Sequence, residues 1–115
     1  MPRDEAAQLA LLQADAEAGV ARAQRHLANR YLRGRGIQRD EAVGMMWLRR
    51  AAEQGLPQAQ RELGEYLERG AGERAAVLEE AGRWYYLAAR SGDRFAREHL
   101  ARLAARRRAA GPGNP

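Results

Sequence analysis

Residues 19–27 read GVARAQRHL, and the same pattern returns twice further along the chain. It recurs 36 residues later at 55–63 as GLPQAQREL, and 37 residues after that at 92–100 as GDRFAREHL. A second pattern, WLRRAAEQG at 47–55, returns at 84–92 as WYYLAARSG, and LLQADAEAG at 11–19 fits the same frame. Agreement at so many positions with one period indicates an internal repeat, and a period of this length is typical of stacked structural units.

Each repeat is predicted to form two helices. In the first unit, the apolar residues between Val20 and Tyr31 are spaced three and four apart, which predicts a single apolar stripe along a helix. Gly34 suits the left-handed backbone that ends such a helix, and Asp40 can cap the next one. The predicted helices span 5–18, 20–33, 39–54, 57–69, 75–90 and 93–108, and no strand pattern is found.

The composition argues against most catalytic chemistry. The chain has 115 residues, the length of one domain, and it contains no cysteine, which excludes disulfides, thiolate zinc sites and a cysteine nucleophile. Ser91 is the only serine and there is no threonine, so few nucleophiles are available for covalent catalysis. No signal-peptide or membrane-spanning pattern is found. We therefore expect a cytoplasmic protein that has no cofactor and is not an enzyme.

The net charge of +5 lies in the last predicted helix. Residues 1–93 contain 14 arginines and 14 acidic residues, whereas residues 94–108 contain six arginines and one acid. Cations near the carboxyl end of a helix interact favourably with its dipole, which accounts for Arg106, Arg107 and Arg108 without a functional role. The alternative is a patch that binds nucleic acid or an anionic surface.

The repeat resembles the Sel-one-like repeat (SLR) family, a relative of the tetratricopeptide repeat. The first unit matches the family pattern at Gly19, Ala23, Gln24, Leu27, Tyr31, Gly34, Gly36, Ile37, Asp40, Trp47, Ala51, Ala52 and Gly55. The second unit matches it at Ala59, Gln60, Leu63, Gly64, Gly70, Gly72, Ala81, Trp84, Ala88, Ala89 and Gly92. The sequence departs from the pattern at Ala28, Gly44 and Leu67, and the loop after residue 69 is the least regular part of the alignment.

This resemblance implies an all-α, right-handed α/α solenoid (superhelix) of antiparallel helix hairpins. The repeat domain would cover 1–108, with a half-unit at 5–18, unit one at 19–54, unit two at 55–91, a partial unit three at 92–108, and a disordered tail at 109–115. Such proteins are usually adaptors, scaffolds or chaperone-like binders, so the resemblance implies a non-catalytic protein–protein interaction module.

The resemblance also implies that the first helix of each unit lines a concave groove. The register then places eight polar side chains in that groove: Arg22, Arg25, Asn29, Arg33, Arg61, Glu65, Arg69 and Arg102. Arginine binds carboxylates through two parallel hydrogen bonds, so an acidic peptide or protein surface is the expected partner. The alternative is an ordinary solvated helix face, whose arginines pair with Glu62, Glu65 and Glu68 at helical spacing.

Three of the aromatic residues are predicted to lie in the core. Trp47 and Trp84 recur at one repeat position, and with Tyr85 they are expected to pack between helices rather than to stack on a ligand. Tyr86 has no aromatic counterpart in the first unit and is expected to be exposed.

Two further hypotheses concern metals and self-association. His26 and His99 occupy the same repeat position about two units apart, which is too far for them to share a metal ion. An array this short leaves its ends uncovered, so a homodimer formed through Leu9, Leu12 or the last helix is a further alternative.

Overall fold

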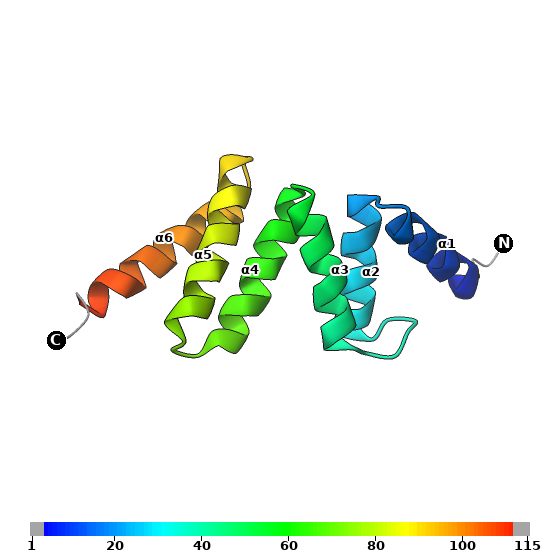
Figure 1. Ribbon diagram of the computed structural model, residues 1–115, viewed down its shortest axis with the longest axis horizontal. Helices are drawn as coiled ribbons and strands as arrows, with labels where there is room; N and C mark the ends of the chain where they lie inside the picture. Colours follow the sequence, from blue (N-terminus) through cyan, green and yellow to red (C-terminus); the bar gives the residue numbers. More distant parts are fainter. Residues whose placement is uncertain (1–3, 112–115) are drawn as a thin grey trace.

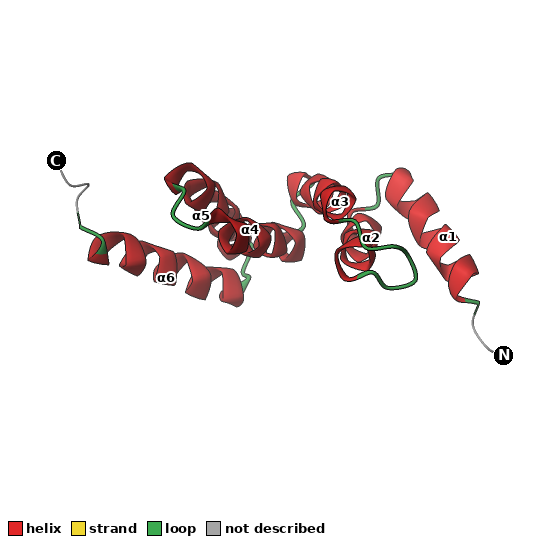
Figure 2. Ribbon diagram, turned by 90° about the horizontal axis from the view of Figure 1, so that it is seen from below, coloured by secondary structure: helices red, strands yellow, loops and turns green. Residues whose placement is uncertain are grey.

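The computed structural model describes residues 4–111, which form six α-helices and no strand (Figures 1 and 2). The helices are α1 (Glu5–Glu17), α2 (Ala21–Arg33), α3 (Glu41–Glu53), α4 (Pro57–Ala71), α5 (Ala75–Arg90) and α6 (Arg94–Ala109). Every helix predicted from the sequence is present, with ends that differ by at most two residues. Ala109, which was predicted to lie in the tail, is the last residue of α6, and residues 112–115 of the predicted tail lie outside the described residues.

The helices lie side by side in chain order and form an elongated body of 62 × 27 × 23 Å (Figure 1). The largest interfaces join α2 to α3 and α4 to α5, which are the hairpins of the two complete units. Smaller interfaces join each hairpin to the next helix, and α1 and α6 cover the two ends. The expected array of hairpins, with no sheet in the described residues, is confirmed.

Local sequence explains where most helices begin and end. Asp40 accepts a hydrogen bond from the backbone N–H of Val43, and Asp93 accepts one from Ala96, as expected of capping residues. In the second unit α4 runs past its predicted end to Ala71, and α5 begins without a side-chain cap. Arg74 instead donates a hydrogen bond to the Ala71 carbonyl, 3.1 Å away, and so satisfies the end of α4.

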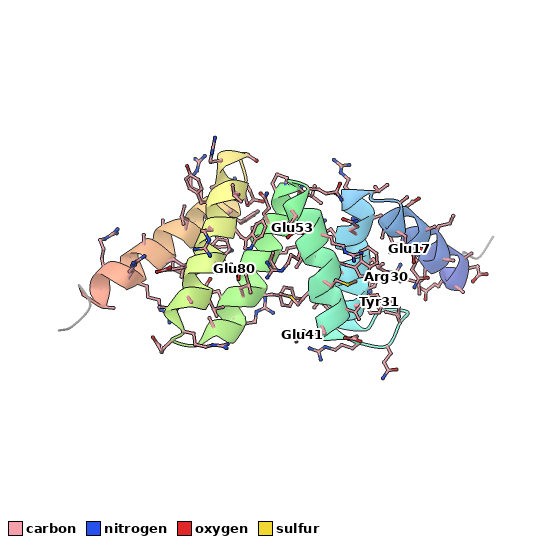
Figure 3. The ribbon with its side chains drawn as sticks, in the orientation of Figure 1. Glu17, Arg30, Tyr31, Glu41, Glu53 and Glu80 are labelled. Carbon is pink, nitrogen blue, oxygen red and sulfur yellow. The ribbon has the colours of Figure 1, made fainter. Side chains whose placement is uncertain are left out.

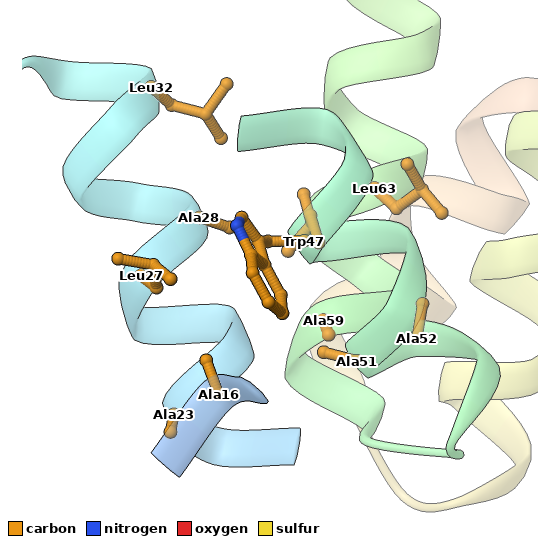
Figure 4. Packing of buried hydrophobic residues seen from close by; sticks show 11 residues of the cluster. Ala16, Ala23, Leu27, Ala28, Leu32, Trp47, Ala51, Ala52, Ala59 and Leu63 are labelled. Carbon is orange, nitrogen blue, oxygen red and sulfur yellow. The ribbon is translucent and has the colours of Figure 1, made fainter. Parts of the chain in front are cut away.

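The core consists of two clusters of buried apolar residues. The larger cluster contains residues of all four helices from α1 to α4. It is built around Trp47, which points from α3 toward Leu27 and Ala28 of α2 (Figure 4). The smaller one is built around Tyr85, the largest fully buried side chain. The expected packing role is confirmed for these two aromatic residues and also for Trp84, which is partly buried and packs against the larger cluster. Tyr86 is 52% exposed, as predicted.

In each hairpin, one glycine lets the two helices approach closely. A Cβ atom at Gly44 of α3 would lie 2.7 Å from Leu32 Cγ, and one at Gly64 of α4 would lie 2.6 Å from Tyr85 Cε1. Neither distance leaves room for a methyl group. The departure from the family pattern at Gly44 is therefore explained by the leucine that occupies the space.

Two buried glutamines join each complete unit to the helix before it. Gln24 donates from Nε2 to the Ala16 carbonyl at 3.1 Å, and Gln60 donates in the same way to the Ala52 carbonyl at 3.2 Å. Each carbonyl also accepts a backbone hydrogen bond, from the Gly19 N–H at 3.0 Å and from the Gly55 N–H at 2.9 Å, so the glutamine takes a second acceptor position and satisfies its own buried amide. The recurring Ala-Gln pair in the sequence thus sets the register between successive units.

Candidate functional site

A row of charged contacts connects the first helices of successive units. Its first contact joins α2 to α4, where the Arg25 guanidinium donates to both carboxylate oxygens of Glu62, at 2.9 and 2.6 Å. Asn29 donates to the same carboxylate at 3.4 Å. Both partners of the ion pair are partly buried, and paired hydrogen bonds of this kind fix geometry as well as adding energy.

The second contact joins α4 to the start of α6. Arg61 donates from Nε to both carboxylate oxygens of Asp93 at 3.1 Å, and it lies 3.4 Å from Glu65 on its own helix. Glu65 in turn lies 2.9 Å from Nε2 of His99. Asp93 thereby does two things, since it caps α6 and anchors that helix to the preceding unit.

The third contact is centred on Glu68. Its carboxylate accepts a hydrogen bond from the Tyr85 hydroxyl at 2.7 Å and one from Arg102 Nη2 at 2.9 Å. The hydrogen bond from Arg102, together with the one from Tyr85, lowers the pKa of Glu68 below its ordinary value even though burial opposes the shift. Burial and the neighbouring carboxylate raise the pKa of Tyr85. This contact joins three helices, α4, α5 and α6.

We expect Glu68→Gln to lower the free energy of unfolding by about 1–2 kcal/mol at pH 7, because a neutral acceptor binds Arg102 more weakly. The pKa of Glu68 is lower in the folded state than its ordinary value of 4.5, so its charge stabilises the fold above that pH and ceases to do so as the pH falls. Urea unfolding of the wild type and the variant from pH 7 to pH 3 should show the difference shrinking with acidity. A difference that stays constant across this range would contradict the assigned charge contact.

The structure divides the predicted groove residues into two groups. Five of them take part in the contacts between units: Arg25, Asn29, Arg61, Glu65 and Arg102. The alternative of pairing with glutamates is correct in part, but most pairs join different units rather than residues one turn apart. Repeats stack with their first helices adjacent, so residues 32 to 37 positions apart become neighbours.

The other three predicted residues, Arg22, Arg33 and Arg69, are exposed. Within residues 4–111 none of them forms an ion pair, although Arg69 lies over the ring of Tyr66 at 4.7 Å. Arg33 differs from Arg22 and Arg69 because it lines a cavity together with Arg25 and Asn29.

That cavity has a volume of about 460 Å³ and is lined by α1, α2, the start of the loop after α2, and Glu62 of α4. Its lining residues are Gln8, Leu12, Arg25, His26, Asn29, Arg30, Arg33, Arg35 and Glu62. Figure 3 shows Arg30 on α2. We call this feature the basic cavity, because it is lined by four arginines and a single acidic residue.

The charge of the basic cavity is only partly balanced. Glu62, the one acid, is already bound to Arg25. The remaining guanidiniums belong to Arg30, Arg33 and Arg35, and among the described residues Arg30 donates only to the Arg35 carbonyl, at 3.3 Å. Arg33 and Arg35 are exposed at the mouth. Such a concentration of positive charge in a hollow attracts anionic groups from solution.

The sequence did not place Arg30, Arg35, His26 or any residue of α1 at this cavity. The predicted positions lie on one face of each first helix and do not include Arg30, whereas Arg35 comes from the loop after α2. That loop is folded back by a hydrogen bond from the Asp40 N–H to the Tyr31 carbonyl at 3.0 Å, and Gly36 there has a positive φ of 73°. The paired glycines around Arg35 were the available signal, since they predict a tight return of the chain.

Three further points concern metal binding, membrane-spanning helices and the arginines near the end of α6. In the described part of the chain, no group of three or more His, Cys, Asp or Glu side chains is placed to hold a metal ion. None of the helices between residues 4 and 111 is long and apolar enough to cross a membrane. Arg106 lies 3.5 Å from Glu73 in the turn between α4 and α5, and Arg107 lies 3.8 Å from Glu79 of α5, so both of these α6 arginines face acids.

Comparisons with known proteins agree with the repeat. The Sel1 repeat model matches residues 21–56 and 57–93. No curated protein matches the sequence.

Two solved structures resemble the fold. One is a Sel1 repeat protein from Oxalobacter formigenes, with 36% identity, 83% of this chain and 71% of that chain covered, and a TM-score of 0.72. The other is c5321, a protective antigen present in uropathogenic Escherichia coli strains that displays an SLR fold, with 28% identity and a TM-score of 0.79. That alignment covers 92% of this chain and 23% of the antigen, so the present chain spans about a quarter of its length.

Proposed function

Because the chain belongs to the Sel1 repeat family, we propose that it is a non-catalytic protein-interaction module that binds an acidic segment of a partner protein in the basic cavity. Sel1 repeat proteins are generally protein–protein interaction modules. The observation that carries the acidic preference is the excess of arginine in the cavity, where Arg30, Arg33 and Arg35 face one hollow and its only acid is already bound to Arg25.

The contacts between units support this division of roles. Arg25, Arg61 and Arg102 hold successive first helices together, so reversing their charge would weaken the fold as well as any binding. Arg33 and Arg35 are exposed and make no ion pair within the described residues, which leaves their guanidiniums available to a partner's carboxylates.

The experiment is a calorimetric titration with a hexaglutamate peptide blocked at both ends. We expect Arg33→Glu/Arg35→Glu to weaken binding by about tenfold or more, because at least one charge-assisted hydrogen bond is replaced by repulsion. The matched control is Arg94→Glu/Arg97→Glu, which makes the same change in net charge on the exposed face of α6, away from the basic cavity. It should bind the peptide as the wild type does.

Two results would overturn the proposal. If both double variants lose affinity equally, the peptide senses only net charge and the basic cavity has no special role. If neither loses affinity, the peptide binds elsewhere. All four substituted side chains are exposed, so we expect the helices to stay intact. Circular dichroism of each variant checks this.

A further inference from the structure

A second hollow, of different chemistry, lies between α5 and α6. The two helices meet at the turn before Asp93 and diverge from there (Figures 1 and 2). Between them is a groove of about 550 Å³ whose apolar lining includes Leu78, Tyr86, Leu100 and Leu103. We call this the apolar groove. It shares no residue with the basic cavity.

Comparison of the repeats explains why the apolar groove is open. Gly82 and Leu103 line it, and one repeat earlier the corresponding residues are Met45 of α3 and Tyr66 of α4. Both of those larger side chains are partly buried and pack against the larger core cluster. At the junction of the second and third units the same positions therefore carry much less side-chain volume, and the space between the helices is left unfilled.

Gly82 has no structural reason to be a glycine. It lies within α5 and does not have a positive φ, and a Cβ atom there would meet nothing within 4 Å. This contrasts with Gly64, where Tyr85 occupies the space. A glycine in the middle of a helix lowers helix stability relative to other residues without any gain in packing here. Its effect on the structure is to keep the floor of the groove open.

The rim of the apolar groove is charged and weakly paired. It carries three arginines and two glutamates, namely Arg83, Arg106, Arg107, Glu73 and Glu79. The pairs of Arg106 with Glu73 and of Arg107 with Glu79, at 3.5 and 3.8 Å, involve exposed side chains and so contribute little to stability. Arg83 is exposed and forms no ion pair among the described residues. Arginine is thus in excess around an apolar floor.

We propose that the apolar groove binds a methionine or aromatic side chain carried on an acidic segment of a partner protein. The anchor would fill the space that Met45 and Tyr66 fill one repeat earlier, and the flanking carboxylates would pair with Arg83, Arg106 and Arg107. A large apolar anchor in a pocket surrounded by charged residues is a common source of binding energy at protein interfaces. This site is independent of the basic cavity, and it can be present whether or not that cavity binds a partner.

The test is a titration of the ¹⁵N-labelled chain, followed by NMR, with three blocked hexapeptides. The first, Glu-Glu-Phe-Met-Glu-Glu, carries both the anchor and the acids. The second, Glu-Glu-Ala-Ala-Glu-Glu, lacks the anchor, and the third, Lys-Lys-Phe-Met-Lys-Lys, lacks the acids. We expect the first peptide to shift the amide resonances of Gly82 and Leu103, and to bind there about tenfold more tightly than either of the others.

Gly82→Met fills the groove from within and should abolish these shifts. It should also raise Tm by about 4 °C, because methionine is the better helix former and has room. Loss of binding with a gain in stability distinguishes a filled site from a misfolded one. Gly70→Ala is the matched control, since Gly70 lies at the end of α4, outside the groove, with nothing within 4 Å of its Cβ position. It should bind the first peptide as the wild type does.

Any of five results would overturn this proposal. The first peptide could leave Gly82 and Leu103 unshifted, or the lysine peptide could bind as tightly. Gly82→Met could retain binding, or it could lower Tm, which would mean that the groove is not open. Shifts of the same resonances with protein concentration alone would assign the groove to a second copy of the chain instead. Failure here is separable from failure at the basic cavity, because Arg33→Glu/Arg35→Glu leaves the apolar groove unchanged.

Discussion

Tyr85→Ala is expected to lower the free energy of unfolding by about 3–5 kcal/mol, the range for truncating a large buried aromatic residue. Tyr85 is fully buried, it forms the centre of the smaller core cluster, and its hydroxyl donates to Glu68 at 2.7 Å. Truncation would leave a cavity between α4 and α5 and remove one of the hydrogen bonds to Glu68. Urea unfolding followed by tryptophan fluorescence measures the loss.

Two variants separate the causes of that loss. Tyr85→Phe keeps the ring and removes only the hydroxyl, so it should cost about 1 kcal/mol. Tyr86→Ala removes the same type of side chain from the neighbouring position, which is 52% exposed, and should change stability by no more than about 0.5 kcal/mol. Equal losses for Tyr85→Ala and Tyr86→Ala would contradict the assigned register of α5.

Gly64→Ala is expected to destabilise the protein by about 1–3 kcal/mol, although alanine is the better helix former. The added methyl group would lie 2.6 and 2.8 Å from the Tyr85 ring and 3.2 Å from the Ala81 carbonyl, and the fully buried ring has nowhere to move. The helices of the second hairpin would have to separate. Thermal and urea unfolding both measure this effect.

The control for this prediction lies six residues away on the same helix. Gly70→Ala adds the same group where nothing lies within 4 Å, so it should cost no stability. Combining Gly64→Ala with Tyr85→Leu should remove most of the cost of the alanine, because contacting residues are not additive. A purely additive double variant would mean that the close approach of α4 and α5 is not what the glycine provides.

The fold was predictable because its signals are local and repeated. Helix ends are set by residues such as Asp40, Asp93 and Gly34, whose effects act within a few positions, and the period adds the same evidence more than once. The main error lay at the end of α4, where Arg74 supplies the missing hydrogen bond from a position that no capping rule identifies.

The candidate site was less predictable because it depends on contacts between units. Arg25 and Arg33 look alike in the sequence, yet Arg25 is bound to Glu62 across the repeat boundary, whereas Arg33 lies at the mouth of the basic cavity. Whether an arginine of α2 reaches a glutamate of α4 depends on how far apart those two helices lie at its position. Arg35 lies at the site because of the conformation of the loop after α2, which a helical register does not describe.

The most direct measurement is the NMR spectrum of the arginine Nε–H groups during titration with hexaglutamate. Binding in the basic cavity predicts that the signals of Arg33 and Arg35 shift first and saturate together, while those of Arg94 and Arg97, which line neither hollow, stay in place. Shifts confined to the arginines of α6, or spread evenly over every exposed arginine, would contradict it.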